Sequence, residues 1–317
     1  MKILIFGRGT IGSFYGWALE KGGHSVEFYV RAGRAAEYGS VLPMEFYDAR
    51  TQFRGILVKE KWVIRVREDL PVDHDYDLIL ISVHHYSFDD VAAFLAPRTA
   101  KATILIFNNF LIEPQQAASQ LPTERLAWGF PGAGGGIDKS GTLRGALYSL
   151  VQFGTFGTDP TERELAVRDL FRKSGFKVQE QRDFRGWLWI HFAASAGLIA
   201  QALTAKGSLK RVMESMTLSR SAILNVREML SVVRARGVNL KIHHIEVIVF
   251  LLPTWVGGLA LKMAIKFNAP LRAGVEYGAN PKEMKSICRD VLEAAELLGV
   301  SVPRLKSVET LFPELVA

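Results

Sequence analysis

The sequence predicts an α/β protein in which an N-terminal Rossmann-type, doubly wound sheet is followed by a C-terminal all-helical domain. Three observations predict it. Short β-rich runs alternate with helical patterns in the first half, a glycine-rich turn follows the first run, and strand signals almost vanish after residue 182. A chain of 317 residues has the length of two domains. We therefore expect a sheet domain over residues 1–182 and a helical domain over residues 183–317.

The predicted strands are short runs of β-branched and other apolar residues. They cover residues 2–6, 25–30, 56–58, 63–66, 78–83, 103–107, 126–130 and 176–178, with one or two more in 143–156 that close the sheet. The runs 78–83 and 103–107 are almost continuously apolar, as expected for strands covered on both faces. Helices are expected from the glycine turn to about residue 22 and over 88–95, 113–120 and 161–174.

Composition excludes several classes of protein. Lys and Arg exceed Asp and Glu by seven, but the charges are dispersed and mixed in sign, so we expect a surface that favours small anionic molecules and no nucleic-acid partner. The single cysteine, Cys288, excludes a disulfide framework and a Cys-based zinc cluster. It lies on an apolar stripe, so we expect a buried thiol. No metal site is expected.

Two apolar stretches were tested as membrane spans. Residues 187–205 are interrupted by polar side chains, and residues 247–261 are too short and are broken by Pro253. Both are predicted to be buried helices, although the second could equally be a subunit contact, which leaves a monomer or a homodimer. The chain begins without a signal-peptide pattern. We expect a cytoplasmic protein with no membrane partner.

The glycine-rich turn Gly7-Arg8-Gly9-Thr10-Ile11-Gly12 has the pattern G-x-G-x-x-G between a strand and a helix. In that context Gly7 allows a tight turn, Gly9 lets a pyrophosphate approach the backbone, and Gly12 lets the helix pack against the strand. The helix N-terminus then offers N–H groups to the phosphates. The alternative is a glycine turn without a ligand. We expect these six residues to bind a dinucleotide.

The end of the second strand indicates which dinucleotide. An NAD site would carry Asp or Glu there, whereas this chain has Val30-Arg31-Ala32-Gly33-Arg34. Arg31 and Arg34 could instead bind a ribose 2′-phosphate. The alternative is a pair of exposed loop arginines. NADP(H) is the expected cofactor.

Several of these segments resemble one known family. They are the opening K-I-L-I-F-G-R-G-T-I-G-S-F-Y-G, the G-H-S-V before the second strand, the arginine that ends that strand, Asn108, the helix around L-W-I-H at residues 188–191, and Glu283 with the tail G-V-S-V-P at 299–303. Together they resemble the ketopantoate reductase (2-dehydropantoate 2-reductase) family over nearly the whole chain.

The resemblance implies reduction of 2-dehydropantoate by NADPH, a step of pantothenate biosynthesis, with the cofactor between a Rossmann domain and a helical one. It implies that a family lysine, the general acid, corresponds to His191, and that two family asparagines correspond to Ser195 and Ile199. It also implies that Asn108, Glu283 and His84 occupy family site positions.

Each of these residues also has a structural interpretation. His191 could protonate the alkoxide that forms when a ketone accepts hydride, and Ser195, four residues on, could hold a substrate oxygen. The alternative is a buried neutral histidine. Glu283 fits equally a helix start, with Asn280 as N-cap and Pro281 at the first position.

Three positions in the sheet domain remain. Asn108 follows a parallel strand, where ligands bind in open sheets, but could be a turn residue. His84 follows another strand and could meet the cofactor or lie in a solvated loop. Gly134 belongs to the glycine run 132–136, which could bring backbone close to the cofactor or form a flexible loop.

The sequence thus predicts an NADP-dependent oxidoreductase that reduces a 2-oxo acid or related carbonyl compound. Catalysis would involve His191, Ser195 and Glu283. Two alternatives remain open: a non-catalytic NADP(H)-binding sensor or interaction protein on a reductase scaffold, and a β-hydroxyacid dehydrogenase.

Overall fold

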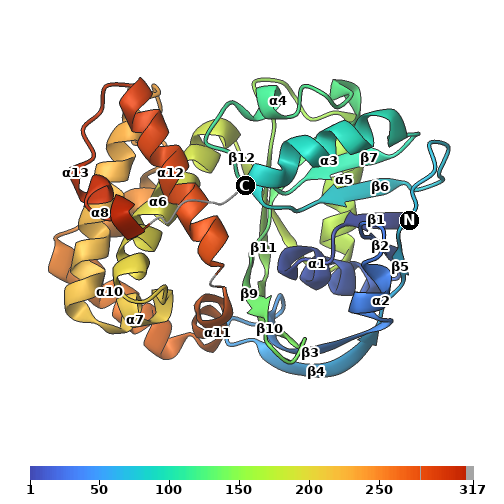
Figure 1. The fold of residues 1–317 in the computed structure, drawn as a ribbon, viewed down its shortest axis with the longest axis horizontal. Helices are drawn as coiled ribbons and strands as arrows, with labels where there is room; N and C mark the ends of the chain where they lie inside the picture. The colour runs from blue at the N-terminus through green and yellow to red at the C-terminus, as the bar shows by residue number, and fades with distance from the viewer. Residues whose placement is uncertain (279, 312–317) are drawn as a thin grey trace. The chain divides into compact units, whose positions relative to one another are not determined.

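The computed structural model describes residues 1–278 and 280–311. They form two compact units, which Figure 1 shows as a sheet with helices and as a group of helices. The first unit, the sheet unit, comprises Met1–Asn108 and Ile112–Phe184. The second, the helical unit, comprises Asn109–Leu111 and the described chain from Arg185 onward.

The sheet unit is built on eight strands in the order β12-β11-β8-β7-β6-β1-β2-β5. Neighbours run parallel except β11 and β8, which are antiparallel. The strands are β1 (Lys2–Phe6), β2 (Ser25–Tyr29), β5 (Val66–Arg67), β6 (Leu78–Ile81), β7 (Thr103–Ile106), β8 (Leu126–Phe130), β11 (Leu150–Gly154) and β12 (Lys177–Gln181). The whole of β6 and β7 is buried, as their apolar runs indicated.

Short connections and helices join these strands. The α-helices are α1 (Thr10–Lys21), α2 (Ala35–Tyr38), α3 (Phe88–Leu95), α4 (Pro114–Ala117) and α5 (Glu162–Lys173), and the 3-10 helices are η1 (His85–Ser87), η2 (Ala96–Arg98) and η3 (Thr123–Arg125). Helix α5 begins with a reciprocal capping box between Thr161 and Glu164. The Rossmann-type sheet predicted from the sequence is confirmed.

A second sheet, of four strands, was not predicted from the sequence. Its order is β4-β3-β10-β9, with β3 (Val41–Ala49), β4 (Ile56–Val63), β9 (Ala133–Ile137) and β10 (Leu143–Tyr148). The prediction that residues 143–156 close the main sheet is therefore half wrong, because only β11 does so while β10 pairs with β3 and β9. The alternative of a flexible glycine loop is also wrong. A Cβ on Gly135 would lie 2.1 Å from the carbonyl oxygen of Arg144, so glycine is needed where β9 pairs with β10.

In the described residues of the helical unit there are helices and no strand. They are α6 (Phe184–Thr204), α7 (Leu209–Glu214), α8 (Met216–Ala235), α9 (His244–Leu251), α10 (Thr254–Phe267), α11 (Ala269–Tyr277), α12 (Pro281–Leu297), α13 (Pro303–Lys306) and the 3-10 helix η4 (Glu309–Leu311). The predicted all-helical C-terminal region is confirmed.

The core of the helical unit forms where α6, α8 and α12 meet. A Cβ on Gly197 of α6 would lie 2.5 Å from the backbone nitrogen of Val226 on α8, so these two helices cross in backbone contact. Cys288 of α12 is fully buried and its thiol donates to the carbonyl of Ala196, as the apolar stripe predicted. Burial raises the pKa of this thiol to about 12.

The short segment Asn109–Leu111 leaves the sheet unit and joins the helical unit. Leu111 is buried among the apolar side chains of this core. Its carbonyl accepts a hydrogen bond from Arg236, whose guanidinium lies 4.7 Å from the centre of the Trp189 ring.

Helix α6 is long and apolar enough to cross a membrane, but 72% of its most apolar window is buried in the protein. It is therefore the central core helix of its unit, as predicted. Helices α9 and α10 would pass the same test only if counted as one span, and they are bent by 112° at the break between them. The prediction that residues 247–261 are buried is wrong in part, because Trp255 and Leu259 are 59% and 45% exposed.

Candidate functional site

The glycine-rich turn has a different local reason for glycine at each position. Gly7 has φ +90° and donates to the carbonyl of Tyr29 at 2.9 Å, so the left-handed backbone places the turn between β1 and β2. A Cβ on Gly12 would lie 2.7 Å from Cγ2 of Ile5, so α1 packs directly on β1. A Cβ on Gly9 would meet nothing within 4 Å.

The N-terminus of α1 can accept an anion. Gly9 is its N-cap and supplies no side-chain hydrogen bond, and no acidic residue lies in the first turn. The N–H groups that open the helix at Thr10 and Ile11 are therefore uncapped by a side chain, beside the space above Gly9. This turn fits a dinucleotide pyrophosphate, which would be held by these backbone groups.

Two arginines gather around one tyrosine beside this turn. The guanidinium of Arg8 lies 4.7 Å from the ring centre of Tyr38, and that of Arg34 lies 5.3 Å from it. Arg34 also donates to the Tyr38 hydroxyl at 3.2 Å and pairs with Glu37 at 2.7 Å. The cationic group is therefore held in place by contacts within the sheet unit.

Arg31 is exposed and precedes this cluster by a few residues. Sequence reasoning missed Tyr38, although its position four residues after Arg34 on a short helix was a usable signal. With Arg8, Arg31 and Arg34, this end of β2 carries three cationic side chains within reach of one loop.

One statement made from the sequence needs correction: a carboxylate does reach the turn after β2. Glu68 follows β5, which pairs with β2, and its Oε1 accepts from the backbone nitrogen of Ala35 at 2.6 Å. The N–H groups of Ala35, Gly33 and Arg34 hold the pKa of Glu68 below its usual range. No local pattern could reveal this residue, because it comes from a strand more than 30 positions later.

Asn108 is buried at the end of β7 and bonds to backbone. Its side-chain nitrogen donates to the carbonyl of Val83 at 2.7 Å, and its side-chain oxygen accepts from the nitrogen of Val83 at 3.4 Å. These bonds tie together the chain segments that leave β6 and β7. The structural interpretation of Asn108 thus has direct support.

Two other candidates of the sheet unit lie at different places. His84 precedes η1 and stacks on Tyr86 with ring centroids 5.2 Å apart. Gly134 lies in β9, which lies against α1, and the backbone nitrogen of Gly132 just before this strand donates to the Tyr15 hydroxyl of α1 at 2.8 Å.

The candidate catalytic residues lie in the helical unit. His191 and Ser195 are both half-buried, one turn apart on α6. Burial lowers the pKa of the His191 imidazole from 6.5 to about 4, so the ring is neutral at pH 7. The interpretation of a buried neutral histidine therefore has direct support.

Glu283 is half-buried in the first turn of α12. Asn280 caps this helix through Oδ1, which accepts from the nitrogens of Lys282 and Glu283 at 3.1 and 3.4 Å, and Pro281 occupies the first helical position. The predicted N-cap and proline are confirmed. Glu283 therefore has a place in a well-formed helix start, which does not require any contact with a substrate.

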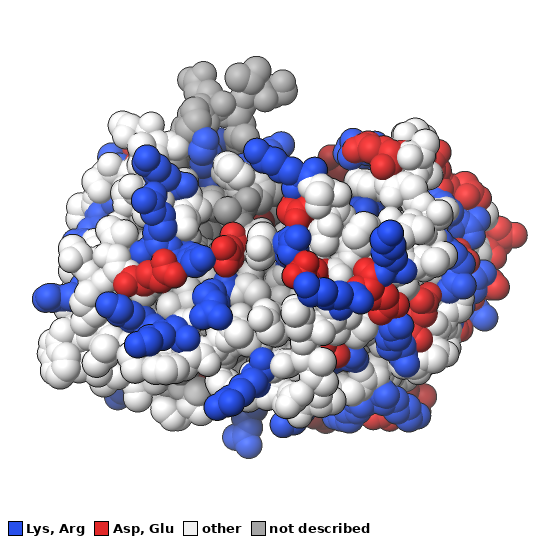
Figure 2. All heavy atoms as spheres, turned by 90° about the horizontal axis from the view of Figure 1, so that it is seen from below, with Lys and Arg blue, Asp and Glu red and all other residues white. Residues whose placement is uncertain are grey.

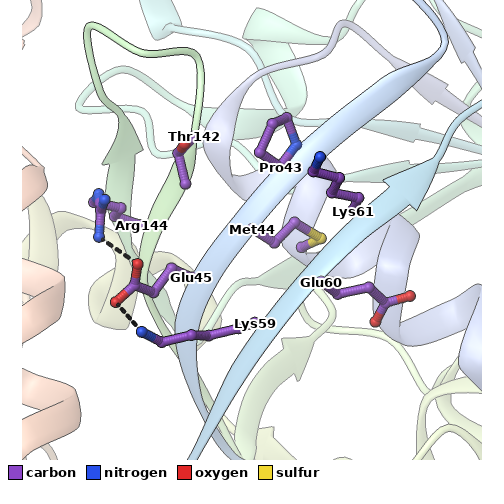
Figure 3. Close-up of a pocket in the computed structure, with 8 residues that line it drawn as sticks. All are labelled: Pro43, Met44, Glu45, Lys59, Glu60, Lys61, Thr142 and Arg144. Carbon is purple, nitrogen blue, oxygen red and sulfur yellow. Dashed lines mark ion pairs between the residues drawn. The ribbon is translucent and has the colours of Figure 1, made fainter.

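A surface hollow of about 360 Å³ lies on the second sheet, away from the glycine turn (Figure 3). Glu45 lies between Lys59, at 3.2 Å, and Arg144, at 3.0 Å. Arg144 also pairs with Asp138 at 2.6 Å. Lys59 and Arg144 are therefore already engaged by carboxylates of this sheet. In the described residues, no three His, Cys, Asp or Glu side chains gather as metal ligands would.

The largely parallel sheet and the glycine turn at the start of α1 define a Rossmann-type fold, followed by a helical unit. The sequence model of the family described as Ketopantoate reductase PanE/ApbA matches residues 3–157, just under half of the chain, so the sheet unit is similar to this family. None of the curated proteins compared with the chain matches it.

Solved structures show the same fold over the whole chain. The 2-dehydropantoate 2-reductase of Geobacter metallireducens GS-15 is 15% identical, with a TM-score of 0.71 over 98% of this chain and 99% of that one. The PanE/ApbA family ketopantoate reductase of Ralstonia eutropha JMP134 is 18% identical, with a TM-score of 0.69 over 98% and 97%. D-mandelate dehydrogenase, solved with NADH and anilino(oxo)acetate, is 16% identical, with a TM-score of 0.71 over 98% and 97%.

Proposed function

We propose that the chain is an NADPH-dependent reductase of a 2-oxo acid or a related carbonyl compound, with ketopantoate as the first substrate to test. The observation that carries this proposal is the uncapped N-terminus of α1 at Gly9, with open space above it and Arg8 in the same turn. The match of the ketopantoate reductase family model to residues 3–157 supports the reaction class.

Within this proposal the sheet unit binds the cofactor. The turn from Gly7 to Gly12 would hold the pyrophosphate, and Arg31 with Arg34 would bind the 2′-phosphate. D-mandelate dehydrogenase, which has a similar fold, was solved with NADH. The preference for NADPH over NADH is therefore argued from this chain's own residues. Arg31 would contribute more than Arg34 to binding the 2′-phosphate, because Arg34 is already paired with Glu37. Bound NADPH would supply hydride to the substrate carbonyl.

His191 is the proposed proton donor to the oxygen of the reduced carbonyl. Its lowered pKa makes the imidazolium a strong acid but a rare species at pH 7, about one molecule in a thousand. Ser195, on the same helix face, would hold a substrate oxygen, and Glu283 would orient the substrate. His84, Asn108 and Gly134 would line the cofactor.

A second candidate function is a non-catalytic NADP(H)-binding sensor on the same scaffold. The neutral state of His191 favours it, because a neutral imidazole is a far weaker acid than imidazolium or the ammonium group of a lysine. We further infer a cytoplasmic protein, a monomer or homodimer, with domains at 1–182 and 183–317 and a small anionic substrate. Pantothenate biosynthesis is the pathway implied by the default substrate.

The test is a fluorescence titration with NADPH and with NADH, followed by ketopantoate in the same cuvette. We expect tighter binding of NADPH and its oxidation when ketopantoate is added. Tight binding without oxidation of NADPH, by ketopantoate and by a panel of other 2-oxo acids, would favour the sensor. Failure to bind either nucleotide would remove the basis of both functions.

A further inference from the structure

An exposed apolar stripe runs along α10. Trp255, Leu259, Met263 and Phe267 follow one another at four-residue intervals and are 59%, 45%, 40% and 65% exposed. This spacing places all four on one side of the helix. The opposite side is packed, since Gly257, Gly258 and Ile265 are buried. Monomeric proteins seldom leave such a row of large apolar side chains uncovered.

Helix α9, which precedes α10 across the bend, also exposes apolar side chains. Ile245, Ile248 and Leu251 are each about half exposed or more. Hydrogen bonds stabilise the bend between α9 and α10, because Arg227 donates to the carbonyl of Phe250 at 2.5 Å and also to that of Leu252. A Cβ on Gly257 would lie 2.5 Å from the carbonyl oxygen of Val249, so glycine allows the two helices to meet. We call the exposed side chains of both helices the α9–α10 face.

The C-terminal part of the chain, which carries this face, has an excess of basic over acidic residues. Residues 185–317 carry 17 Lys and Arg against 10 Asp and Glu, whereas residues 1–184 carry 22 of each, so the whole net charge of +7 lies in the C-terminal part. Residues 206–272 carry 11 basic and 3 acidic residues. Figure 2 shows blue side chains with little red over the helical part of the face it draws, and both colours mixed over the sheet part.

Two lysines lie within the stripe itself. Lys262 and Lys266 are exposed and, at 100° per residue, share the side of α10 that carries Trp255 and Leu259. Between residues 247 and 275 the sequence has no Asp or Glu. A two-fold contact between copies of this face would therefore bring the lysines of both copies together, with the half-buried Glu246 of α9 as the one acidic residue of these two helices. The surface is complementary to an anion-bearing, apolar partner instead.

We propose that the α9–α10 face binds peripherally to the surface of an anionic lipid bilayer. Helices that lie in a membrane interface combine Trp, Phe and Leu with Lys in this way, the rings entering the acyl boundary and the ammonium groups bonding to phosphates. This proposal departs from the sequence expectation of no membrane partner, and it is independent of the proposed reductase activity. It requires no membrane-spanning segment.

Trp255 provides a direct readout. The other five tryptophans, at 17, 62, 128, 187 and 189, are each at most 8% exposed. A change in indole environment on adding vesicles therefore reports on Trp255. We expect the full chain to sediment with vesicles of phosphatidylcholine mixed with phosphatidylglycerol, with a blue shift of its emission, and to remain in the supernatant with pure phosphatidylcholine.

Variants separate the two parts of the face. Trp255→Ser with Phe267→Ser should raise the vesicle concentration for half-binding at least about tenfold, from the loss of apolar burial. Lys262→Gln with Lys266→Gln should raise it by roughly tenfold or more. The matched controls lie in the sheet unit: Phe53→Ser, at a side chain that is 75% exposed, and Lys61→Gln with Lys139→Gln. The controls should bind as the parent does, and every variant should keep the parent Tm.

Three results would overturn the proposal. One is the absence of binding to anionic vesicles. Another is equal binding to phosphatidylcholine alone, which would remove the role of the lysines. The third is a dimer, measured by sedimentation, that dissociates in the Trp255→Ser, Phe267→Ser variant while vesicles stay free of protein, which would assign the face to a second copy.

Discussion

The imidazole of His191 lies flat against the indole of Trp187, with ring centroids 5.3 Å apart and planes 13° from parallel. The two residues are one helical turn apart on α6, so the pairing is local. Contact with an apolar ring removes water from the imidazole, and burial is the cause of its pKa of about 4. The candidate proton donor is thereby kept neutral at physiological pH.

This relationship predicts the pH dependence of turnover. If imidazolium is the donor, kcat rises as the pH falls from 8 towards 5, by close to tenfold per unit, because the protonated fraction grows at that rate above the pKa. His191→Ala should lower kcat by roughly 10²–10⁴-fold. The measurement is NADPH oxidation under saturating substrate. A flat profile with unchanged turnover in the variant would assign the proton to another group.

The same group predicts the pH dependence of stability. Folding lowers the pKa of His191 from 6.5 to about 4, so the unfolded chain binds more protons between these values. The contribution of His191 to stability is complete above about pH 6.5 and is lost as the pH falls through this window, by up to about 3 kcal/mol. His191→Phe, which keeps a ring against Trp187, should flatten the fall. Urea titrations at several pH values measure it, and an unchanged slope would contradict the assignment.

Gly9 and Gly12 form a matched pair of substitution sites. Gly9→Ala puts a methyl group into open space, so Tm should stay unchanged while the Kd for NADPH rises about tenfold or more through overlap with the pyrophosphate. Gly12→Ala forces a Cβ against Ile5, so it should lower Tm. Fluorescence titration and thermal unfolding distinguish them. Unimpaired NADPH binding by Gly9→Ala would place the ligand elsewhere.

Arg31 is the residue proposed to select NADPH over NADH. Arg31→Ala should raise the Kd for NADPH by about 10–100-fold and leave that for NADH nearly unchanged, because a charged hydrogen bond to phosphate is worth ~1.5–3 kcal/mol. Arg34→Ala should have a smaller effect, since Arg34 already pairs with Glu37. The ratio of the two Kd values is the measured quantity. A parallel loss for both nucleotides would show that Arg31 does not read the 2′-position.

The crossing of α6 and α8 predicts a large local effect. Gly197→Ala should destabilise the protein by at least about 1–3 kcal/mol, because the methyl group would overlap the backbone of Val226 and neither helix can yield easily. Ser195→Ala, on the same helix and half-buried, is the control and should change the free energy of unfolding little. Equal Cm values for the two variants in urea would contradict the close crossing.

Local patterns were sufficient to predict the main sheet, because its central strands β6 and β7 are buried over their whole length and its strands alternate with helices. The second sheet escaped prediction for physical reasons. Residues 132–136 are mostly glycine, which has poor strand propensity, and they pair only because β10 approaches without intervening side chains. Residues 41–49 contain Pro43, which cannot donate a backbone hydrogen bond, yet β3 pairs with β4 and β10.

The candidate site likewise contains residues that the local sequence could predict and residues that it could not. The structural tasks of Gly7 and Gly12 were predictable because they are local to one turn, whereas the predicted role of Gly9 in binding a pyrophosphate stays a prediction. Glu68 was not, because it reaches Ala35 only through the pairing of β5 with β2. The pKa of His191 was also beyond sequence reasoning, since it depends on how deeply α6 is buried by its neighbours.

The segment from Asn109 to Leu111 has a consequence for how the chain can be divided. Because Leu111 is buried in the helical core and its carbonyl accepts from Arg236, residues 185–317 alone lack a piece of their own interior. A fragment that begins at residue 185 would leave the Arg236 guanidinium without the Leu111 carbonyl, and the helical core without the Leu111 side chain. The helical unit is therefore built from two separate stretches of the chain, and residues 185–317 do not contain all of its core.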